Sequence, residues 1–544
     1  MNTLYYGDNL PILRKYVADE SVDIIYLDPP FNSNRSYSVM FKDESGSDSH
    51  AQITAFEDTW HWTFETEQTY QELIASGPHR VGFMVGALRE ALGTNQMMAY
   101  LVMMAARLVE LYRVLKPTGT LYLHCDPTAD HYLRMILETI FDSHNFKNEI
   151  IWQRINAKGN VQRKFGAIHD VIISYAKRLG EETWNQLYRP LDPAYVADMY
   201  RYVEEGTGRR YRLGDLSAPS LRASKGQKYE WKGRKLPKTR CWVYAKEKME
   251  ELEQQGLIIY TKHGLPRYKR YLDENQGEKL PDLWTDIHVA SGHESLGYPT
   301  QKPVALLGRI ILASSNEGDI VLDPFCGCGT TIHAAQRLKR RWIGIDITHL
   351  AIALQKYRLK EVLGLVEKQD YAVIGEPQDI AGARQLAQED RYQFQWWALS
   401  LIQAQPVGGE SGGKTGKKGK DRGIDGVIPF LDDPKSKPKK LVAQVKSGKV
   451  KPSDIRDLVG AVEREKAAMG VFITLEPASR DMLSEAASAG VYHSPNWNKE
   501  YPKIQILTID DLFAGATVQM PPTARSYPKA RRETLGTAEQ QALY

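Results

Sequence analysis

Two short runs of the sequence, each placed directly after an apolar segment, constrain the fold more than any other feature. The first run covers residues 28–31 and follows residues 22–27, and the second covers residues 323–331 and follows residues 320–322. Short apolar segments of this kind are typical of buried strands in a parallel sheet. Ligands bind open α/β sheets at the carboxyl ends of such strands. The sequence therefore predicts an α/β fold with both runs at the ligand-binding edge of a doubly wound sheet.

The first run, Asp28-Pro29-Pro30-Phe31, carries groups suited to methyl transfer onto an exocyclic amine of a base. Such an amine, for example adenine N6, is a poor nucleophile because its lone pair is delocalised into the ring. The carboxylate of Asp28 and the backbone carbonyl of Pro29 can accept its two hydrogens, and the ring of Phe31 can stack on the base. Pro29 and Pro30 fix φ, so the loop holds these acceptors in place before a substrate binds. We interpret all four residues as catalytic.

The second run is rich in glycine and indicates a binding loop. Gly327 and Gly329 let the backbone approach a ligand closely, since neither carries a side chain. Thr330 and Thr331 are expected to begin the next helix, whose N-terminus would point at the ligand. This run therefore complements the catalytic one.

Together the two runs resemble the motifs of S-adenosylmethionine-dependent DNA amino-methyltransferases, with D-P-P-F as the catalytic motif and F-x-G-x-G as the cofactor motif. The catalytic motif comes first, which resembles the permuted class called β, in which a target-recognition region lies between the two halves. In that family D-P-P-[YF] usually accompanies an N6-adenine target, whereas N4-cytosine enzymes more often carry serine first. The resemblance covers residues 1–375. It implies a Rossmann-like methyltransferase sheet, S-adenosylmethionine as cofactor, double-stranded DNA as substrate and flipping of the target base.

The resemblance also implies a set of cofactor-binding residues. Residues 299–303 resemble the T-x-K-P element that precedes the cofactor strand, and Asp346 ends the next strand, where a carboxylate takes ribose hydroxyls. Asp8 resembles an acidic position that contacts the adenosine, although it would serve equally well as an ordinary helix N-cap. The implied residues are Asp8, Thr300, Gln301, Lys302, Asp323, Phe325, Gly327, Gly329, Thr330, Thr331 and Asp346.

Residues 177–298 lose regular periodicity and become basic and aromatic. By its position between the two halves, this region resembles the target-recognition region. Its aromatic residues include Tyr211, Tyr229, Trp231, Trp242, Tyr260, Tyr268 and Tyr271. Lys and Arg beside aromatic rings suit neutralisation of DNA phosphates and reading of base edges. The alternative is an insert whose aromatic residues form a core of their own.

The segment after residue 375 carries a second possible site. On a strand over residues 441–446, Gln444 and Lys446 would point to one face, with Asp425 on the neighbouring strand. An Asp, an acceptor and a Lys so placed can hold a divalent metal, orient a water and stabilise a pentacovalent phosphate. The pattern resembles PD-(D/E)XK nucleases, most closely Mrr-like restriction endonucleases, and implies Mg²⁺ on Asp425 and Gln444 with Lys446 catalytic. Because an amide binds Mg²⁺ less strongly than a carboxylate, an inactive DNA-binding module is the alternative.

Composition excludes several other classes. A net charge of +4 over 544 residues permits a polyanionic partner. The 4 cysteines suit neither a disulfide framework nor a zinc site. Residues 408–415 spell G-x-x-x-x-G-K-T, but they lack a preceding strand and a following helix, so we expect no ATP binding. With no apolar run of membrane length and no signal-peptide core, a bacterial or archaeal cytoplasm and no membrane partner are expected.

The sequence therefore predicts a multidomain chain. Its segments are a catalytic half at 1–176, a target-recognition region at 177–298, a cofactor half at 299–375, a nuclease domain at 376–515 and a tail at 516–544. Residues 32–95 are interpreted as a loop over the catalytic pocket. The leading hypothesis is a fused modification and restriction enzyme, compatible with a homodimer. RNA or protein is the alternative substrate, and the large basic insert argues for a long nucleic acid rather than a protein side chain.

Overall fold

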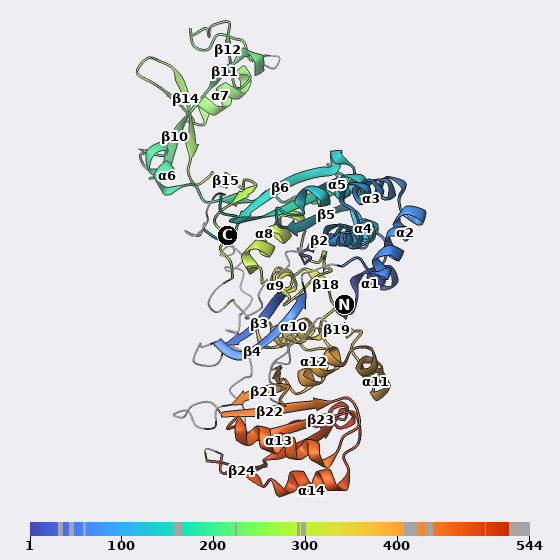
Figure 1. Cartoon of the computed structure of the whole chain (residues 1–544). Coiled ribbons are helices and arrows are strands. Elements are labelled where there is room, and N and C mark those ends of the chain that lie inside the picture. Colours follow the sequence, from blue (N-terminus) through green and yellow to red (C-terminus); the bar gives the residue numbers. More distant parts are fainter. Residues whose placement is uncertain are drawn as a thin grey trace. The chain divides into compact units, whose positions relative to one another are not determined.

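The computed structural model describes most of the chain. The described residues are 1–30, 36–42, 48–57, 61–156, 163, 165–222, 226–290, 294, 301–406, 423–430, 432, 439–495 and 497–521. The chain divides into two compact units (Figure 1). Unit 1 comprises Met1–Asn185 and Asp282–Tyr544, and unit 2 comprises Gln186–Pro281. No helix in the described part of the chain is long and apolar enough to cross a membrane.

A nine-stranded sheet forms the centre of unit 1, in the order β16-β6-β7-β5-β2-β17-β18-β1-β19. β7 runs antiparallel to both of its neighbours, and the other pairs are parallel. The strands are β1 (Asn2–Tyr6), β2 (Val22–Leu27), β5 (Leu115–Cys125), β6 (Phe146–Gln153), β7 (His169–Ala176), β16 (Leu283–Trp284), β17 (Ile320–Asp323), β18 (Arg341–Asp346) and β19 (Tyr371–Ile374).

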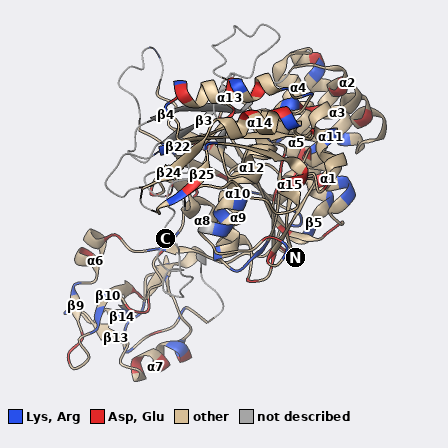
Figure 2. Cartoon of the chain, turned by 90° about the horizontal axis from the view of Figure 1, so that it is seen from below, with Lys and Arg blue, Asp and Glu red and all other residues tan. Residues whose placement is uncertain are grey.

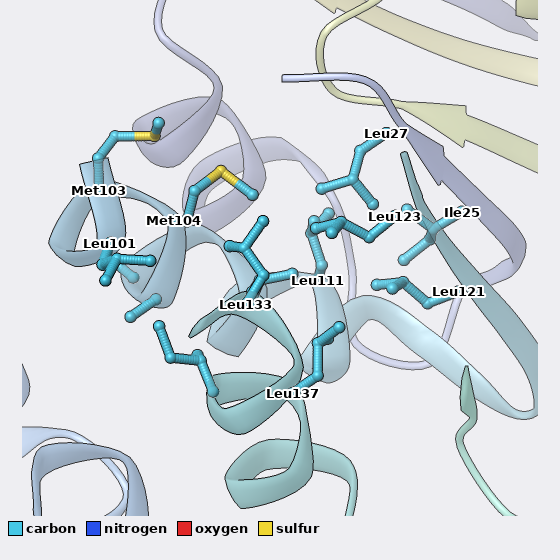
Figure 3. Packing of buried hydrophobic residues seen from close by; sticks show 14 of the residues in the cluster. Ile25, Leu27, Leu101, Met103, Met104, Leu111, Leu121, Leu123, Leu133 and Leu137 are labelled. Carbon is cyan, nitrogen blue, oxygen red and sulfur yellow. The ribbon is translucent and has the colours of Figure 1, made fainter. Parts of the chain in front are cut away.

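Helices cover both faces of this sheet. One hydrophobic core includes α1 (Asn9–Tyr16), α3 (His79–Leu92), α4 (Gln96–Val114) and α5 (Asp130–Phe141), and the other includes α8 (Val304–Ser314), α9 (Thr330–Arg337) and α10 (His349–Glu361). β2 contributes to both, because successive side chains of a strand point to opposite faces. Ile25 and Leu27 pack in the first core, seen in Figure 3, and Ile24 and Tyr26 in the second. The predicted doubly wound α/β fold is confirmed.

The strand order explains why the two sequence runs meet. β2 and β17 are parallel neighbours, with Val321 paired to Ile24 and Leu322 to Ile25. The chain continues from β2 to β5 on one side of this pair and from β17 to β18 on the other. The sheet order therefore reverses between β2 and β17, which is the position at which open α/β sheets bind their ligands.

The interpretation of residues 32–95 as a loop was wrong. Their described parts contain β3 (Ser36–Lys42) paired with β4 (Asp48–Glu57), then α2 (Phe64–Ser76) and α3. The side chain of Thr63 caps α2 by accepting a hydrogen bond from the backbone of Thr66. Val81 and Val85 of α3 are fully buried. The polar residues that suggested a loop are the exposed sides of two helices whose apolar stripes are narrow.

Unit 2 has its own small core. A four-stranded antiparallel sheet has the order β13-β14-β10-β9. The elements of unit 2 are β8 (Tyr188–Arg189), α6 (Pro193–Met199), β9 (Tyr202–Val203), β10 (Arg210–Asp215), β11 (Ser217–Pro219), η2 (Ser220–Arg222), β12 (Arg240–Trp242), α7 (Lys246–Gln254), β13 (Ile258–Tyr260), β14 (Pro266–Tyr271) and β15 (Glu278–Lys279). Trp231 and Trp242 are buried together with Met249. Their enrichment in this region is therefore explained by packing, which favours the alternative of an aromatic core.

The C-terminal part of unit 1 forms a five-stranded sheet in the order β20-β21-β22-β23-β26. β21 is antiparallel to β22, while β22, β23 and β26 are parallel. The elements are α11 (Ile380–Glu389), α12 (Arg391–Leu401), β20 (Gln405–Pro406), β21 (Gly426–Phe430), β22 (Lys439–Lys446), α13 (Pro452–Arg464), β23 (Met469–Thr474), α14 (Arg480–Ser488), β24 (Val491–Ser494), β25 (Lys499–Pro502), β26 (Ile504–Thr508) and α15 (Ile509–Phe513). Leu441, Ala443 and Val445 face one core and Val442 faces the other.

Candidate active site

A single pocket at the carboxyl ends of β1, β2, β17 and β18 brings most of the predicted site residues together. Its wall includes Asp8, Asp28, Pro29, Pro30, Gln301, Lys302, Asp323, Phe325, Gly327, Thr330, Thr331 and Asp346. Gly329 belongs to the same loop and caps α9. Phe31 and Thr300 lie outside the described residues.

Asp28 follows β2 directly and projects one unsatisfied oxygen into a buried position. Its Oδ2 forms an ion pair with Nζ of Lys302, which comes from the segment before α8. Its Oδ1 is buried and has no hydrogen-bond partner among the described residues. Buried acceptors in folded proteins nearly always have a partner. Asp28 Oδ1 is therefore placed to accept a hydrogen from a ligand.

The glycine loop is held tightly between β18 and α10. The Cys326 N–H donates to the carbonyl of Ile345 at 3.1 Å, and the Gly327 N–H donates to Asp346 Oδ2 at 2.9 Å. From the other side, Gln355 Nε2 donates to the carbonyl of Gly327 at 2.6 Å. The backbone of the loop is thus fixed before any ligand binds.

Glycine is required at position 329 for two separate reasons. Its φ is +78°, in the left-handed region that side chains rarely adopt. A Cβ there would also lie 2.8 Å from Gln355 Cγ. The residue therefore allows both the turn into α9 and the close packing of α10 against the loop.

Asp346 accepts more hydrogen bonds from the protein than binding of ribose hydroxyls alone would need. Besides the Gly327 N–H on Oδ2, its Oδ1 accepts hydrogen bonds from the Thr348 N–H and hydroxyl, both at 2.9 Å. Burial raises its pKa. Asp346 thus orders the glycine loop, and its contact with a ribose stays a prediction.

Asp323 lies at the end of β17, beside Asp28. Its Oδ1 accepts a hydrogen bond from the Phe325 N–H at 3.0 Å. Burial is the main cause that raises the pKa of this carboxyl to about 7. The charge of the pocket therefore changes near neutral pH.

Asp8 combines both roles that the sequence left open. It caps α1, because Oδ1 accepts a hydrogen bond from the Leu10 N–H at 2.9 Å, and it also lines the pocket. The same oxygen accepts one from Arg107 Nη2 at 2.8 Å. Arg107 lines the pocket from α4, and sequence reasoning missed it. The available signal was a lone arginine within the apolar stretch of that helix.

Tyr26 is a second residue of the pocket wall that sequence reasoning missed. It lies on β2, two residues before Asp28, and both residues line the pocket. A tyrosine inside an apolar strand gives no sign of a polar role by itself. Its hydrogen-bond partner comes from a distant part of the sequence, at His124.

In the C-terminal sheet, the residues implied as a nuclease site are neighbours. Oδ2 of Asp425 accepts a hydrogen bond from the backbone N–H of Val445 at 2.7 Å, between Gln444 and Lys446 on β22. Its Oδ1 accepts another from Gln395 Nε2 at 2.8 Å. Gln444 Oε1 is buried and has no hydrogen-bond partner among the described residues. The amide oxygen of Gln444 is thus available as an acceptor, whereas both oxygens of the neighbouring Asp425 already accept hydrogen bonds from the protein.

The described residues do not provide a conventional metal centre. They contain no group of three or more His, Cys, Asp or Glu side chains placed to hold an ion. Asp425 and Gln444 would supply one carboxylate and one amide oxygen. Mg²⁺ prefers an octahedral shell of oxygens and is usually held by one or two carboxylates with water and phosphate. The pair fits such an ion only if water and a DNA phosphate complete the shell.

Comparison with known proteins shows that this C-terminal region has relatives of its own. Residues 411–514 match the family described as NACHT-associated inactive Restriction Endonuclease 1. The C-terminal region is thus similar to restriction endonucleases whose description marks them as inactive. It is α/β in architecture, like the larger sheet.

Solved structures similar to the chain include methyltransferases. A putative DNA modification methylase from Thermus thermophilus, complexed with S-adenosyl-L-methionine, is 18% identical, with a TM-score of 0.32 over 69% of this chain and 100% of that one. A cytosine-N4-specific methyltransferase, PvuII, is 13% identical, with a TM-score of 0.29 over 66% of this chain and 86% of that one.

Two curated relatives each match somewhat less than two thirds of the chain. The type II methyltransferase M.EcaI of Enterobacter cloacae is 32% identical over 63% of this chain and 66% of its own length. The StyLTI Mod subunit of Salmonella typhimurium is 26% identical over 62% of this chain and 50% of its own length. The chain thus spans from half to just under two thirds of these relatives. The family model of DNA methylases, N6_N4_Mtase, matches residues 22–356, and the chain belongs to this family of DNA methyltransferases.

Proposed function

We propose that the chain transfers a methyl group from S-adenosylmethionine to N6 of adenine in double-stranded DNA, with the motif order of the β class. The observation that carries this proposal is the buried, unpartnered Oδ1 of Asp28 in the wall of the pocket. It is a buried acceptor without a donor, which supports the assignment of Asp28 as the acceptor for the target amine. The D-P-P-F spelling supports adenine as the target.

The catalytic loop would act by accepting hydrogens from the target amine. Asp28 Oδ1 and the carbonyl of Pro29 accept the two N–H hydrogens, which returns electron density to the nitrogen. The ion pair with Lys302 holds the Asp28 carboxylate in one orientation, so the acceptor is positioned in advance. Phe31, if it stacks on the base as the sequence predicts, completes the site.

The remaining wall of the pocket would bind the cofactor. S-adenosylmethionine supplies an electrophilic methyl group on a positively charged sulfur. Asp323 places a carboxyl at the end of β17, beside the glycine loop, and its ionised form would attract that charge. Asp8 and Asp346 offer carboxylate oxygens to the adenosine, Gly327 lines the pocket beside it, and Gly329 lets α10 pack closely behind the loop. Gln301 and Lys302 close the pocket from the segment before α8.

The proposal assigns target recognition to unit 2, because the insert lies between the two sequence halves. Its charges alone do not carry this role. Figure 2 shows both signs on α7, and Arg209 and Lys269 are ion paired with acids of the same unit, Asp273 and Glu204. Recognition would therefore rest on the shape of the unit and on the remaining basic side chains.

Sequencing that detects modified bases tests the proposed reaction directly. DNA from cells that express the chain should carry N6-methyladenine at one sequence motif, and DNA from cells that express Asp28→Ala should not. N4-methylcytosine in place of N6-methyladenine would overturn the choice of target base. Absence of any modified base, together with no methyl transfer in vitro to unmodified duplex DNA, would refute the proposed function.

Metal-dependent DNA cleavage by the C-terminal region is the second candidate function. The buried Gln444 Oε1 without a partner, next to Asp425, favours it. The engagement of both Asp425 oxygens by Gln395 and Val445, and the inactive description of the matching family, oppose it. Lys446 would stabilise the phosphate in such a reaction.

Incubation with DNA of every methylation state separates the two possibilities. If the second function exists, the wild type should cut some duplex in Mg²⁺ or Mn²⁺, EDTA should stop it, and Lys446→Ala should lose cleavage while keeping methyl transfer. If no DNA is cut under any of these conditions, the region is a binding module. Its affinity for DNA should then be measured with Lys446→Ala as the comparison.

A further inference from the structure

Behind Asp28, three buried polar side chains form a continuous hydrogen-bonded chain across three neighbouring strands. Tyr26 lies on β2, His124 on β5 and Asp170 on β7, with relative exposures of 1%, 0% and 2%. The Tyr26 hydroxyl lies 2.7 Å from His124 Nδ1, and His124 Nε2 lies 3.2 Å from Asp170 Oδ2. Tyr26 lines the pocket, so this hydrogen-bonded series begins at the candidate active site and leads away from it.

The protonation states of these three side chains follow from their burial, the nearby charges and their hydrogen bonds. Burial first, and then the charge of Lys302, lowers the pKa of His124, so the imidazole is neutral. Although burial opposes it, the hydrogen bond with His124 lowers the pKa of Asp170, which is therefore a carboxylate and can only accept. Nε2 of His124 must then carry the hydrogen, and Nδ1 holds a lone pair. The Tyr26 hydroxyl donates to that lone pair.

This arrangement leaves the Tyr26 oxygen with only acceptor capacity toward the pocket. Asp28, which follows β2 two residues later and lines the same pocket, is the neighbouring acceptor. The far end of the chain reaches the surface, because Asp170 Oδ1 lies 3.0 Å from Nε of Arg154, whose side chain is 37% exposed. Three groups that can hold or pass a proton thus lie between the pocket and Arg154, which itself stays protonated and balances the Asp170 carboxylate.

We propose that Tyr26, His124 and Asp170 form a relay that carries away the proton released from the methylated amine. This inference rests on the proposed methyl transfer. The bond between the methyl carbon and sulfur breaks with its electron pair on sulfur, and a new bond forms from the lone pair of the amine nitrogen. The nitrogen then carries a positive charge and loses one hydrogen as a proton to Asp28 Oδ1.

The proton cannot rest on Asp28 without cost, because a protonated Asp28 no longer neutralises the charge of Lys302 in a largely buried place. It passes to the Tyr26 oxygen, directly or through one water, as Tyr26 gives its own hydrogen to His124 Nδ1. The imidazolium that results is held by the Asp170 carboxylate. Burial and Lys302 both disfavour it. Once the methylated base has left, His124 Nδ1 therefore returns the proton to the Tyr26 oxygen while the Tyr26 hydroxyl gives its hydrogen to water in the pocket, and the starting state is restored. No oxidant or second cofactor is needed.

The alternative is that the three side chains only satisfy one another inside the sheet. A matched pair of variants separates the two. Tyr26→Phe removes the hydroxyl from the relay. Tyr122→Phe is the control and removes a buried hydroxyl from the neighbouring strand, where Tyr122 is paired with Tyr26. The Tyr122 hydroxyl lies 2.6 Å from that of Ser314, and neither residue lines the pocket. Both changes remove one buried hydrogen bond and keep the ring.

The measurement is the single-turnover rate of methyl transfer to duplex DNA from pH 5 to 8.5, in water and in deuterium oxide. The wild-type rate should fall toward the acid end of this range as His124 gains a proton, at a lower pH than for an ordinary histidine because burial lowers its pKa. Tyr26→Phe should be about 100-fold slower, with the acid limb and the solvent isotope effect lost and cofactor affinity unchanged. Tyr122→Phe should keep the wild-type rate, acid limb and isotope effect.

A Tyr26→Phe protein with the wild-type rate and pH profile would overturn the relay, and so would equal losses in both variants. If Tyr26→Phe does not fold, as judged by its thermal transition, Asp170→Asn serves in its place. That variant should slow transfer about tenfold or more and move the acid limb, because the charge that sets the His124 tautomer is gone. An Asp170→Asn protein with an unchanged rate and limb would refute the relay. If the wild type itself transfers no methyl group, the proposed function fails instead.

Discussion

The larger sheet and the C-terminal sheet both place an aspartate beside a neighbouring strand, but the two carboxylates differ in what the protein already binds to them. Asp28 keeps Oδ1 without a partner in a pocket wall, with Lys302 on its other oxygen. Asp425 has Gln395 on one oxygen and Val445 on the other, and the unpartnered atom is the amide oxygen of Gln444. A motif locates a residue, whereas the acceptors left vacant determine which chemistry that residue can support.

The largest effect is expected at Asp28. Asp28→Ala removes the acceptor for the target amine, so methyl transfer should fall by about 1,000-fold or more, comparable with removal of one preorganised catalytic group. Cofactor affinity, measured by calorimetric titration with S-adenosylmethionine, should change little. Asp19→Ala is the control, because its side chain is 73% exposed and pairs with Arg113 at the surface. Retained transfer by Asp28→Ala would remove the contrast between the two sheets.

The second effect concerns the charge of Asp323. Its pKa of about 7 in the folded chain lies above the ordinary 3.8, so the folded state holds the proton more tightly than the unfolded state. The free energy of unfolding should therefore decrease as pH rises from 4 to 7, by about 4 kcal/mol in total. Urea unfolding of wild type and Asp323→Asn across this range tests it. The variant should lack the decrease, and parallel curves for the two proteins would count against the assignment.

Binding of a positively charged cofactor should respond in the opposite direction. Ionisation of Asp323 adds a negative charge to the pocket, so affinity for S-adenosylmethionine should rise by a few-fold to about tenfold between pH 6 and pH 8. Asp323→Asn should bind with an affinity that changes less over this range. Titrations of both proteins at three pH values are sufficient, and a wild-type affinity that falls with pH would contradict the placement of the charge.

The third effect concerns Gly329, where a side chain would both strain the left-handed backbone and contact Gln355. Gly329→Ala should cost about 1–2 kcal/mol of strain from the left-handed φ, with a further loss from contact with Gln355. Gly318→Ala is the matched control, since its φ is +87° but no atom lies within 4 Å of a Cβ. Cofactor affinity should fall only for Gly329→Ala. Equal effects of both changes on affinity would show that the clash with Gln355 is unimportant.

The smallest effect is expected in the C-terminal sheet, from a substitution that makes the Asp425 site resemble a two-carboxylate metal site. Gln444→Glu adds a carboxylate beside Asp425, and should raise Mg²⁺ affinity about tenfold, since carboxylates bind this ion more strongly than amides. Stabilisation of the chain by Mg²⁺ in thermal unfolding is the readout, with Gln505→Glu as the control on β26. If Gln444→Glu responds to Mg²⁺ no more than Gln505→Glu does, the pair with Asp425 is not a metal site.

Local patterns were sufficient for the elements that carry the candidate site. Asp28-Pro29-Pro30 and the loop around Gly327 follow β2 and β17 as expected, because short apolar segments with adjacent breakers are local signals. The helices within residues 61–92 were missed because few of their residues are buried. In unit 2, composition did not reveal that Trp231 and Trp242 face inward, since aromatic residues serve cores and binding surfaces equally.

The sequence by itself determined the fold class, the order of the two motifs and the family, because each depends on residue types within a short stretch. Only the tertiary structure decided which polar atoms are already satisfied. The partners concerned lie far apart in the chain, as with Lys302 and Asp28, Arg107 and Asp8, or His124 and Tyr26. A hydrogen bond depends on distance and direction in space, and these are set by the packing of whole strands and helices.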